Sequence, residues 1–159
     1  MSDTPHQPTA DALQRMKAMM QFTPQARALG IDVTRIEEGR VWGHVPYRTE
    51  LVGDPDTGVI AGGVVTTLLD QLCGVAAVLA QAHPTSVATI DLRIDYMRPA
   101  EVGHDVQAEA QCFKLTRHVA FVRAIAYDRD AADPLAHATA TFMLDSSAGR
   151  GAQIYRGKK

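Results

Sequence analysis

Apolar residues recur at every second position in the C-terminal half of the chain. In VATIDLRIDYM (87–97), alternate residues from Ile90 to Tyr96 are apolar and those between them are charged, the pattern of a half-buried strand. Strict alternation places Thr89 with the charged residues, so its hydroxyl is expected to point outward. Three further segments between turn residues also predict strands: HDVQAEAQCF (104–113), RHVAFVRAIAYD (117–128) and LAHATATFMLD (135–145).

Apolar residues form a long run, rather than an alternation, in the middle of the chain. The stretch GVIAGGVVTTLLDQLCGVAAVLAQA (58–82) predicts one long helix from about Ala61 to Ala82. Helical spacing predicts two shorter helices near the N-terminus, over 11–20 and 24–30. The next segments predict two short strands joined by a Glu-Gly turn in 31–47, then a loop in 48–59.

These elements together predict an α+β domain. A helix that is apolar around most of its circumference has to be buried, and a curved antiparallel sheet wrapped around it is the economical solution. We expect an N-terminal helical extension over 1–24, the main domain over 25–145 and a flexible tail over 146–159.

Composition and charge exclude several classes of function. The chain has 159 residues, enough for one domain with its own core, and a formal net charge of -2 with scattered basic residues. Binding to nucleic acid or to an anionic membrane surface is therefore not indicated. The six histidines form no HxxxH or HExxH pattern, so a metal site is not expected.

Cysteine use and the N-terminal sequence predict a soluble, cytoplasmic protein. Cys73 and Cys112 stand apart in apolar surroundings and are expected to be reduced thiols. The N-terminal stretch is polar and has no apolar core of a signal peptide. The long apolar stretch carries Asp70 and Gln71 near its middle, which disfavours a membrane span.

Gly62 and Gly63, at the predicted start of the long helix, are candidates for anion stabilisation. The first N–H groups of a helix lack intrahelical partners, and glycines let a ligand approach them closely. A thioester or ester carbonyl held there would have its developing oxyanion stabilised. The alternative, given equal weight, is that the glycines only let the helix pack tightly as it meets the sheet.

Asp70 is the candidate acid among the apolar residues of the predicted helix. It lies eight residues after Gly62, about 12 Å along a helix at 1.5 Å per residue. One helix therefore cannot place both groups on the same carbonyl, and a joint site requires two chains. The alternatives are a carboxylate paired with an arginine or one facing solvent. An acid set among leucines nevertheless needs a purpose or a partner.

Two segments carry a resemblance to a known family. The order of GGVVTTLLD (62–70) on the helix and IDLRIDYMRPAEVG (90–103) on the next strand resembles the hotdog-fold acyl-CoA thioesterases of the phenylacetate-pathway type, over roughly residues 25–145. The resemblance implies a hotdog fold. It also implies that Gly62, with Gly63 beside it, is the oxyanion donor and that Asp70 of the partner subunit is the base or nucleophile.

The resemblance also suggests further site residues. Thr89 matches a strand hydroxyl that orients water in some members, and Asp54 falls near a position that contacts the thioester region. Ala61 stands where the family usually has histidine. Three basic residues are implied in binding CoA phosphates by charge-assisted contacts: Arg98, Lys114 and Arg117.

The expected function is hydrolysis of a medium-chain or aromatic acyl-CoA by a homodimer, or by a dimer of dimers, with no cofactor or metal required. A non-catalytic acyl-CoA-binding or sensing protein is the alternative from another class. A hotdog hydratase or dehydratase is less favoured, because the helix has no histidine.

Overall fold

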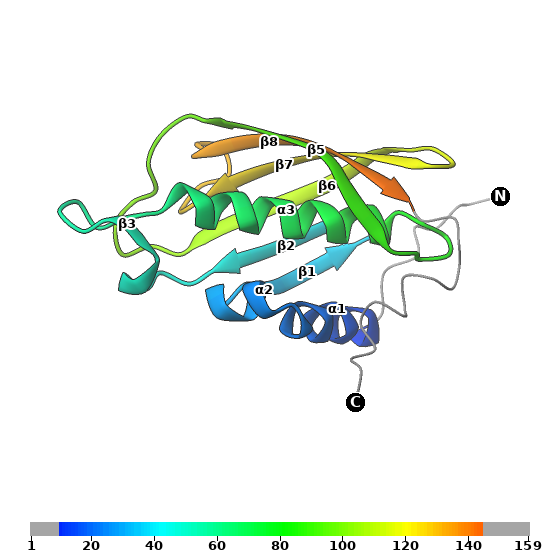
Figure 1. Cartoon of the computed structure of the whole chain (residues 1–159), viewed down its shortest axis with the longest axis horizontal. Coiled ribbons are helices and arrows are strands. Elements are labelled where there is room, and N and C mark those ends of the chain that lie inside the picture. The colour runs from blue at the N-terminus through cyan, green and yellow to red at the C-terminus, as the bar shows by residue number, and fades with distance from the viewer. Residues whose placement is uncertain (1–9, 145–159) are drawn as a thin grey trace.

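The structure, a computed structural model, describes residues 10–144. The predicted tail (146–159) and the first nine residues of the predicted extension lie outside the described residues, and the domain division at 24/25 stays a prediction. The helices are α1 (Ala10–Phe22), α2 (Pro24–Leu29) and α3 (Gly62–Leu79). Figure 1 shows α3 lying across the sheet, with α1 and α2 alongside the β1 edge.

Six strands form one antiparallel sheet in the order β1–β2–β6–β7–β8–β5. They are β1 (Asp32–Glu37), β2 (Arg40–Val45), β6 (Val106–Leu115), β7 (Val119–Tyr127), β8 (Ala136–Leu144) and β5 (Val87–Tyr96). The free side of β5, a ten-residue edge strand, pairs with no other strand of residues 10–144. The predicted α+β architecture of the hotdog fold, a curved antiparallel sheet with one long central helix, is confirmed (Figure 1).

Most predicted elements are confirmed, with shifted ends. The predicted turn joins β1 to β2 at Gly39, whose φ of 62° is a left-handed conformation that glycine adopts without strain. Strand β6 continues two residues beyond the predicted 113, and α3 ends at Leu79 rather than at Ala82.

The segment 48–59 was expected to be loop, and that expectation is wrong in part. It contains a short 3-10 helix (Thr49–Leu51) and one strand of a small ribbon, β3 (Val52–Asp54) paired with β4 (Val59–Ile60). The Asp54 carboxylate accepts hydrogen bonds within the intervening turn, from the Asp56 N–H at 3.0 Å and the Thr57 hydroxyl at 3.0 Å. Local side-chain bonds of this kind let a turn-rich sequence form a regular ribbon.

The core lies between α3 and the sheet. Nine of the eighteen residues of α3 are buried, among them Leu68, Leu69 and Leu72. Gly43 on β2 lets the two elements approach, because a Cβ there would lie 2.6 Å from the Asp32 carbonyl oxygen and 3.0 Å from Leu72. The sheet covers only one side of α3, however. The other side, called the uncovered side below, stays exposed or half-buried among residues 10–144: Gly62, Gly63, Thr66, Thr67, Asp70, Gln71, Gly74, Val78 and Leu79.

By length and composition alone, α3 could cross a membrane, with a mean hydropathy of 1.6 over its 18 residues. Half of those residues are buried inside the domain, however, where the helix packs on the sheet. The apolar side of α3 therefore forms part of the protein core.

Candidate active site

The first turn of α3 presents two free backbone donors. Ala61 precedes the helix in an extended conformation, so Gly62 and Gly63 are its first two residues. The Ala61 N–H donates to the Leu51 carbonyl, which ties the helix start to the segment before the ribbon. Within residues 10–144, the N–H groups of Gly62 and Gly63 donate to no acceptor. Both are available to an oxyanion, as the sequence predicted.

Packing within the chain does not explain why these residues are glycines. A Cβ at Gly62 would meet only Tyr96, with its hydroxyl oxygen at 3.7 Å and its ring carbon Cζ at 3.8 Å, which is ordinary contact. A Cβ at Gly63 would meet nothing within 4 Å. Neither residue has a positive φ. The interpretation as packing glycines therefore finds no support in residues 10–144. The open space over the two N–H groups leaves room for a ligand or for a second chain.

Asp70 lies half-buried on the uncovered side of α3. Its Oδ1 accepts a hydrogen bond of 3.0 Å from the Thr89 hydroxyl. No lysine, arginine or histidine within 10–144 forms an ion pair with it. The structural alternative of an arginine-paired acid is therefore wrong for the described chain. The carboxylate is oriented by a hydroxyl and keeps lone pairs for another donor, such as water.

The expected outward orientation of Thr89 is wrong. The pairing of β5 with β8 shifts by one residue between Thr89 and Asp91, so Ile90 forms a β-bulge and is 53% exposed. A bulge reverses the alternation on one side of it. Thr89 consequently lies opposite the buried Phe142, on the sheet face that carries α3, and its hydroxyl reaches Asp70.

Cys73 lies one turn from Asp70 and is fully buried. Burial, with a smaller contribution from the Asp70 charge, raises the pKa of its thiol to about 12. The thiol is therefore protonated at neutral pH and unsuited to act as a nucleophile. Cys73 and Cys112 are both free, as expected.

A hollow of about 370 Å³ opens beside the first turn of α3. Gly62 and Tyr96 form part of its wall, and most of the remaining lining is apolar: Val59, Ile60, Val65, Met97, Pro99, Ala100 and Leu135. Arg98 also borders it. An apolar group attached to a carbonyl at Gly62 would have a place to lie here.

Ala61 and Asp54 lie near the helix start but are engaged in the ribbon. Ala61 packs tightly on the backbone of β3, because a Cβ at Gly53 would lie 2.9 Å from the Ala61 Cα. Both carboxylate oxygens of Asp54 accept hydrogen bonds in its own turn. Their roles toward a substrate stay predictions.

The Arg98 guanidinium is held by internal contacts. It donates to both Asp128 oxygens, at 2.7 and 2.8 Å, and to the Asp133 carbonyl at 2.7 Å. Its Nε lies 3.2 Å from the Asp133 carboxylate. Asp128 is only 6% exposed. These contacts use the donors that a CoA phosphate would need, so the structure gives that prediction for Arg98 no support.

Lys114 and Arg117 lie at the opposite end of α3 from Gly62. They belong to the β6–β7 hairpin (Figure 1). Gly39 lies between β6 and the end of α3, because a Cβ there would lie 3.5 Å from Ala80 and 3.6 Å from the Cys112 carbonyl. The structure brings Asp70 and Thr89 together but does not bring Lys114 or Arg117 to Gly62.

Tyr96 is a residue of this region that sequence reasoning did not select. Its hydroxyl donates to the Gly62 carbonyl at 2.7 Å and lies 2.9 Å from the Thr66 hydroxyl. The one signal in the sequence was a phenol at the end of an otherwise aliphatic strand face.

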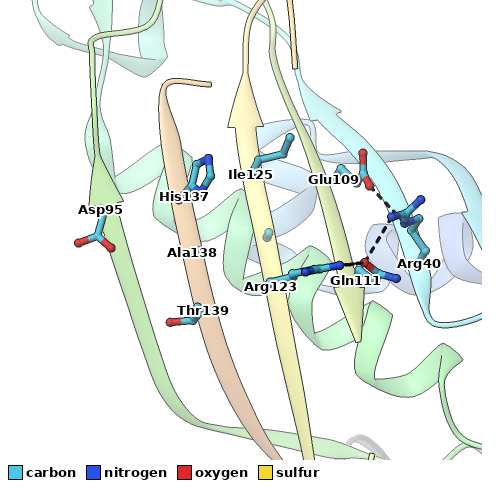
Figure 2. Close-up of a pocket in the computed structure, with 10 residues that line it drawn as sticks. Arg40, Asp95, Glu109, Gln111, Arg123, Ile125, His137, Ala138 and Thr139 are labelled. Carbon is cyan, nitrogen blue, oxygen red and sulfur yellow. Dashed lines mark hydrogen bonds and ion pairs between the residues drawn. The ribbon is translucent and has the colours of Figure 1, made fainter. Parts of the chain in front are cut away.

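A second hollow, of about 460 Å³, lies on the sheet face away from α3. Figure 2 shows Arg123 and Arg40 both directed at Gln111, whose side-chain oxygen accepts from Arg123 at 2.9 Å and from Arg40 at 3.3 Å. Arg40 also pairs with Glu109 at 3.2 Å. None of the predicted site residues lines this hollow.

Comparison with known proteins places the chain in a family. Residues 57–134 match the thioesterase superfamily. A protein of Halobacterium salinarum whose name proposes an esterase is 37% identical over 75 residues, 45% of this chain and only half of that protein. The medium/long-chain acyl-CoA thioesterase YigI of Salmonella typhimurium is 29% identical over 134 residues, 76% of this chain and 85% of that protein.

A solved structure shares the fold. The crystal structure of a Pseudomonas aeruginosa protein is 37% identical and matches with a TM-score of 0.75, over 82% of this chain and 97% of that one. The chain belongs to the thioesterase superfamily.

Proposed function

We propose that the chain hydrolyses a medium-chain or aromatic acyl-CoA to the free acid and CoA. The observation that carries the proposal is the uncovered side of α3, which holds two unpartnered N–H groups and a carboxylate without a cation. The N–H groups can stabilise the oxygen of a thioester carbonyl under attack, and the carboxylate can activate water or attack the carbonyl directly.

The proposed roles follow from this chemistry. The Gly62 N–H, with that of Gly63 beside it, donates to the thioester oxygen as negative charge develops there. Asp70, oriented by Thr89, then acts in one of two ways. As a base it takes a proton from water, which attacks the carbonyl and expels the CoA thiolate. As a nucleophile it attacks directly, expels the thiolate and forms a mixed anhydride, which water then hydrolyses.

A second copy of the chain completes the proposed site. Gly62 and Asp70 lie about 12 Å apart along one helix, too far to share a carbonyl. The unpaired edge of β5 and the uncovered side of α3 are surfaces that a second copy would cover. A homodimer, or a dimer of dimers, would bring Gly62 of one chain to Asp70 of the other. Lys114 and Arg117 would reach the CoA phosphates of such a site only across the interface.

The acyl group is proposed from the apolar hollow beside Gly62. Its lining suits an aliphatic or aromatic group rather than a charged one. The name of the Salmonella relative supports a medium-length chain, whereas the aromatic option rests on the resemblance of the two sequence segments.

We also propose that the protein acts in the cytoplasm, where free thiols such as those of Cys73 and Cys112 stay reduced.

Release of free thiol over a panel of acyl-CoAs tests the activity. We expect the chain to turn over at least one medium-chain or aryl thioester and to leave acetyl-CoA largely intact. Preference for acetyl-CoA would contradict the proposed acyl group. Tight binding of acyl-CoA without any turnover would instead favour a binding or sensing protein.

Mixing two inactive variants tests whether the site needs two chains. Gly62→Pro removes the N–H donor at the first helical position, where proline is well tolerated, and Ala61 already has the extended conformation that a following proline requires. Asp70→Asn removes the carboxylate. Random mixing makes half of the dimers mixed, each with one intact site, so about a quarter of wild-type activity should return.

The matched control is Gly62→Ala, which keeps the N–H and adds a Cβ at ordinary contact distance from Tyr96. If Gly62→Ala loses as much activity as Gly62→Pro, the added side chain rather than the lost donor is responsible. If the mixture stays inactive while the mixed dimers are shown to form, the two groups do not act across the interface.

A further inference from the structure

Tyr96 connects the end of β5 to the first turn of α3. Its hydroxyl donates a 2.7 Å hydrogen bond to the Gly62 carbonyl, across 34 residues of sequence. The Thr66 hydroxyl also donates to that carbonyl, at 3.1 Å, but from within the same helix. Of these two hydroxyl donors, only that of Tyr96 connects the Gly62 carbonyl to a different element, β5.

The bonded carbonyl belongs to the same peptide group as a proposed oxyanion donor. The Gly62 C=O and the Gly63 N–H are the two ends of one planar amide, so a bond that fixes the carbonyl also fixes the direction of the N–H. A donor to the oxygen of an amide polarises it and makes its N–H a stronger donor. The Gly63 N–H itself has no acceptor within residues 10–144.

Side-chain packing adds little to the restraint that the helix and the Thr66 hydroxyl give this peptide. A Cβ at Gly63 would meet nothing within 4 Å, and glycine has the most mobile backbone of any residue. The Tyr96 bond adds a restraint from outside the helix, at the helix end, where backbone order is weakest. Tyr96 is half exposed and lines the hollow beside Gly62, so its ring faces the place proposed for the acyl group.

We propose that Tyr96 is a positioning residue for catalysis, whose hydroxyl orients and polarises the Gly62–Gly63 peptide that binds the oxyanion. This inference rests on the proposed thioesterase function. It assigns Tyr96 a contribution that grows as charge develops on the thioester oxygen, so the hydroxyl affects kcat more than substrate binding.

The variant Tyr96→Phe tests the proposal, because it keeps the ring that lines the hollow and removes only the hydroxyl. Loss of one hydrogen bond that strengthens in the transition state is expected to lower kcat about three- to tenfold. KM, and the Kd of a non-hydrolysable alkyl thioether of CoA, should change by less than about twofold, since the thioether has no carbonyl to polarise. The Gly63 amide resonance in a ¹H–¹⁵N spectrum should shift.

Tyr47→Phe is the matched control. The Tyr47 hydroxyl also donates to a backbone carbonyl, that of Gly58 at 2.8 Å, but in the ribbon before α3. We expect this variant to lose a similar amount of stability while kcat and the Gly63 resonance stay unchanged.

Three results would overturn the proposal. In the first, Tyr96→Phe keeps its kcat. In the second, it weakens thioether binding as much as it lowers kcat, which would make Tyr96 a binding residue. In the third, Tyr47→Phe loses kcat equally, which would indicate a general effect on folding. A wild type that hydrolyses no acyl-CoA overturns the proposed function and this inference together, whereas an active wild type with an unaffected Tyr96→Phe overturns this inference alone.

Discussion

Asp70→Asn is expected to lower the rate of thioester hydrolysis at least about a hundredfold, the size of effect typical of losing a general base. Asparagine has nearly the same shape as aspartate, and its side-chain oxygen can still accept from the Thr89 hydroxyl at the observed 3.0 Å. The variant therefore keeps the local structure and loses only the basic or nucleophilic carboxylate. Thiol release by the purified variant, on the best wild-type substrate, measures the effect.

Two further variants separate this role from an indirect one. Thr89→Val removes the hydroxyl that orients Asp70 and should cost less, about three- to tenfold, because one hydrogen bond is lost and the carboxylate remains. Asp91 lies two residues after Thr89 on β5 and opposite Thr141, on the outer face of the sheet. Asp91→Asn should therefore leave the rate unchanged. Equal turnover by Asp70→Asn and the wild type would make Asp70 structural.

Alternation and helical spacing predicted most of the fold because those elements bury one continuous face. In β7 and β8 every second residue is buried, as in Ala120, Val122 and Ala124, so the period of two is visible in the sequence. The ribbon within 48–59 was missed because side-chain hydrogen bonds in its turn, such as those to Asp54, leave no periodic signal.

The bulge in β5 shows where the pattern fails. Ile90 continues the apolar alternation of Leu92 and Ile94, yet it is the extra residue in the pairing with β8 and is more than half exposed. Nothing in the local sequence distinguishes it from its neighbours. The bulge turns Thr89 toward α3, so strict alternation gave this candidate residue the wrong face.

The candidate site was only partly predictable for a related reason. Gly62, Gly63 and Asp70 lie on one helix, so their spacing is available from the sequence alone. Tyr96 reaches Gly62, and Arg98 reaches Asp128, only through contacts between elements far apart in the chain. The second contact engages Arg98 with the buried Asp128 carboxylate, while its predicted role at a CoA phosphate stays a prediction.

That ion pair carries the largest stability effect that we expect. Asp128→Asn should lower the free energy of unfolding by about 3 kcal/mol, because Arg98 would lose the buried carboxylate that binds both its terminal nitrogens and keep only that of Asp133, which is 78% exposed. The value lies at the lower end of the range for broken buried pairs because the Arg98 side chain is 28% exposed, although the Asp128 side chain is only 2% exposed. Urea denaturation at pH 7 and a fixed protein concentration measures it.

The matched control is Asp95→Asn, which breaks an Arg–Asp pair on the exposed face of β5, where the Arg93 and Asp95 side chains are 72% and 58% exposed. Water screens such a pair, so the expected loss is below about 1 kcal/mol. A similar loss from both variants would mean that burial does not decide the contribution of Asp128.

The pH dependence distinguishes an ionic role for Asp128 from simple packing. Its hydrogen bonds from Arg98, and those from the Glu101 and Arg129 backbone N–H groups, hold the pKa of its carboxyl well below the usual range despite burial. A carboxyl whose pKa falls on folding stabilises the fold at pH values above its unfolded pKa, about 3.9, and loses that contribution as the pH falls toward its folded value. The difference in unfolding free energy between wild type and Asp128→Asn should therefore stay constant from pH 7 to about pH 5 and narrow below about pH 4. A difference that persists unchanged in acid would mean that the neutral contacts of Asp128, rather than its charge beside Arg98, stabilise this end of the sheet.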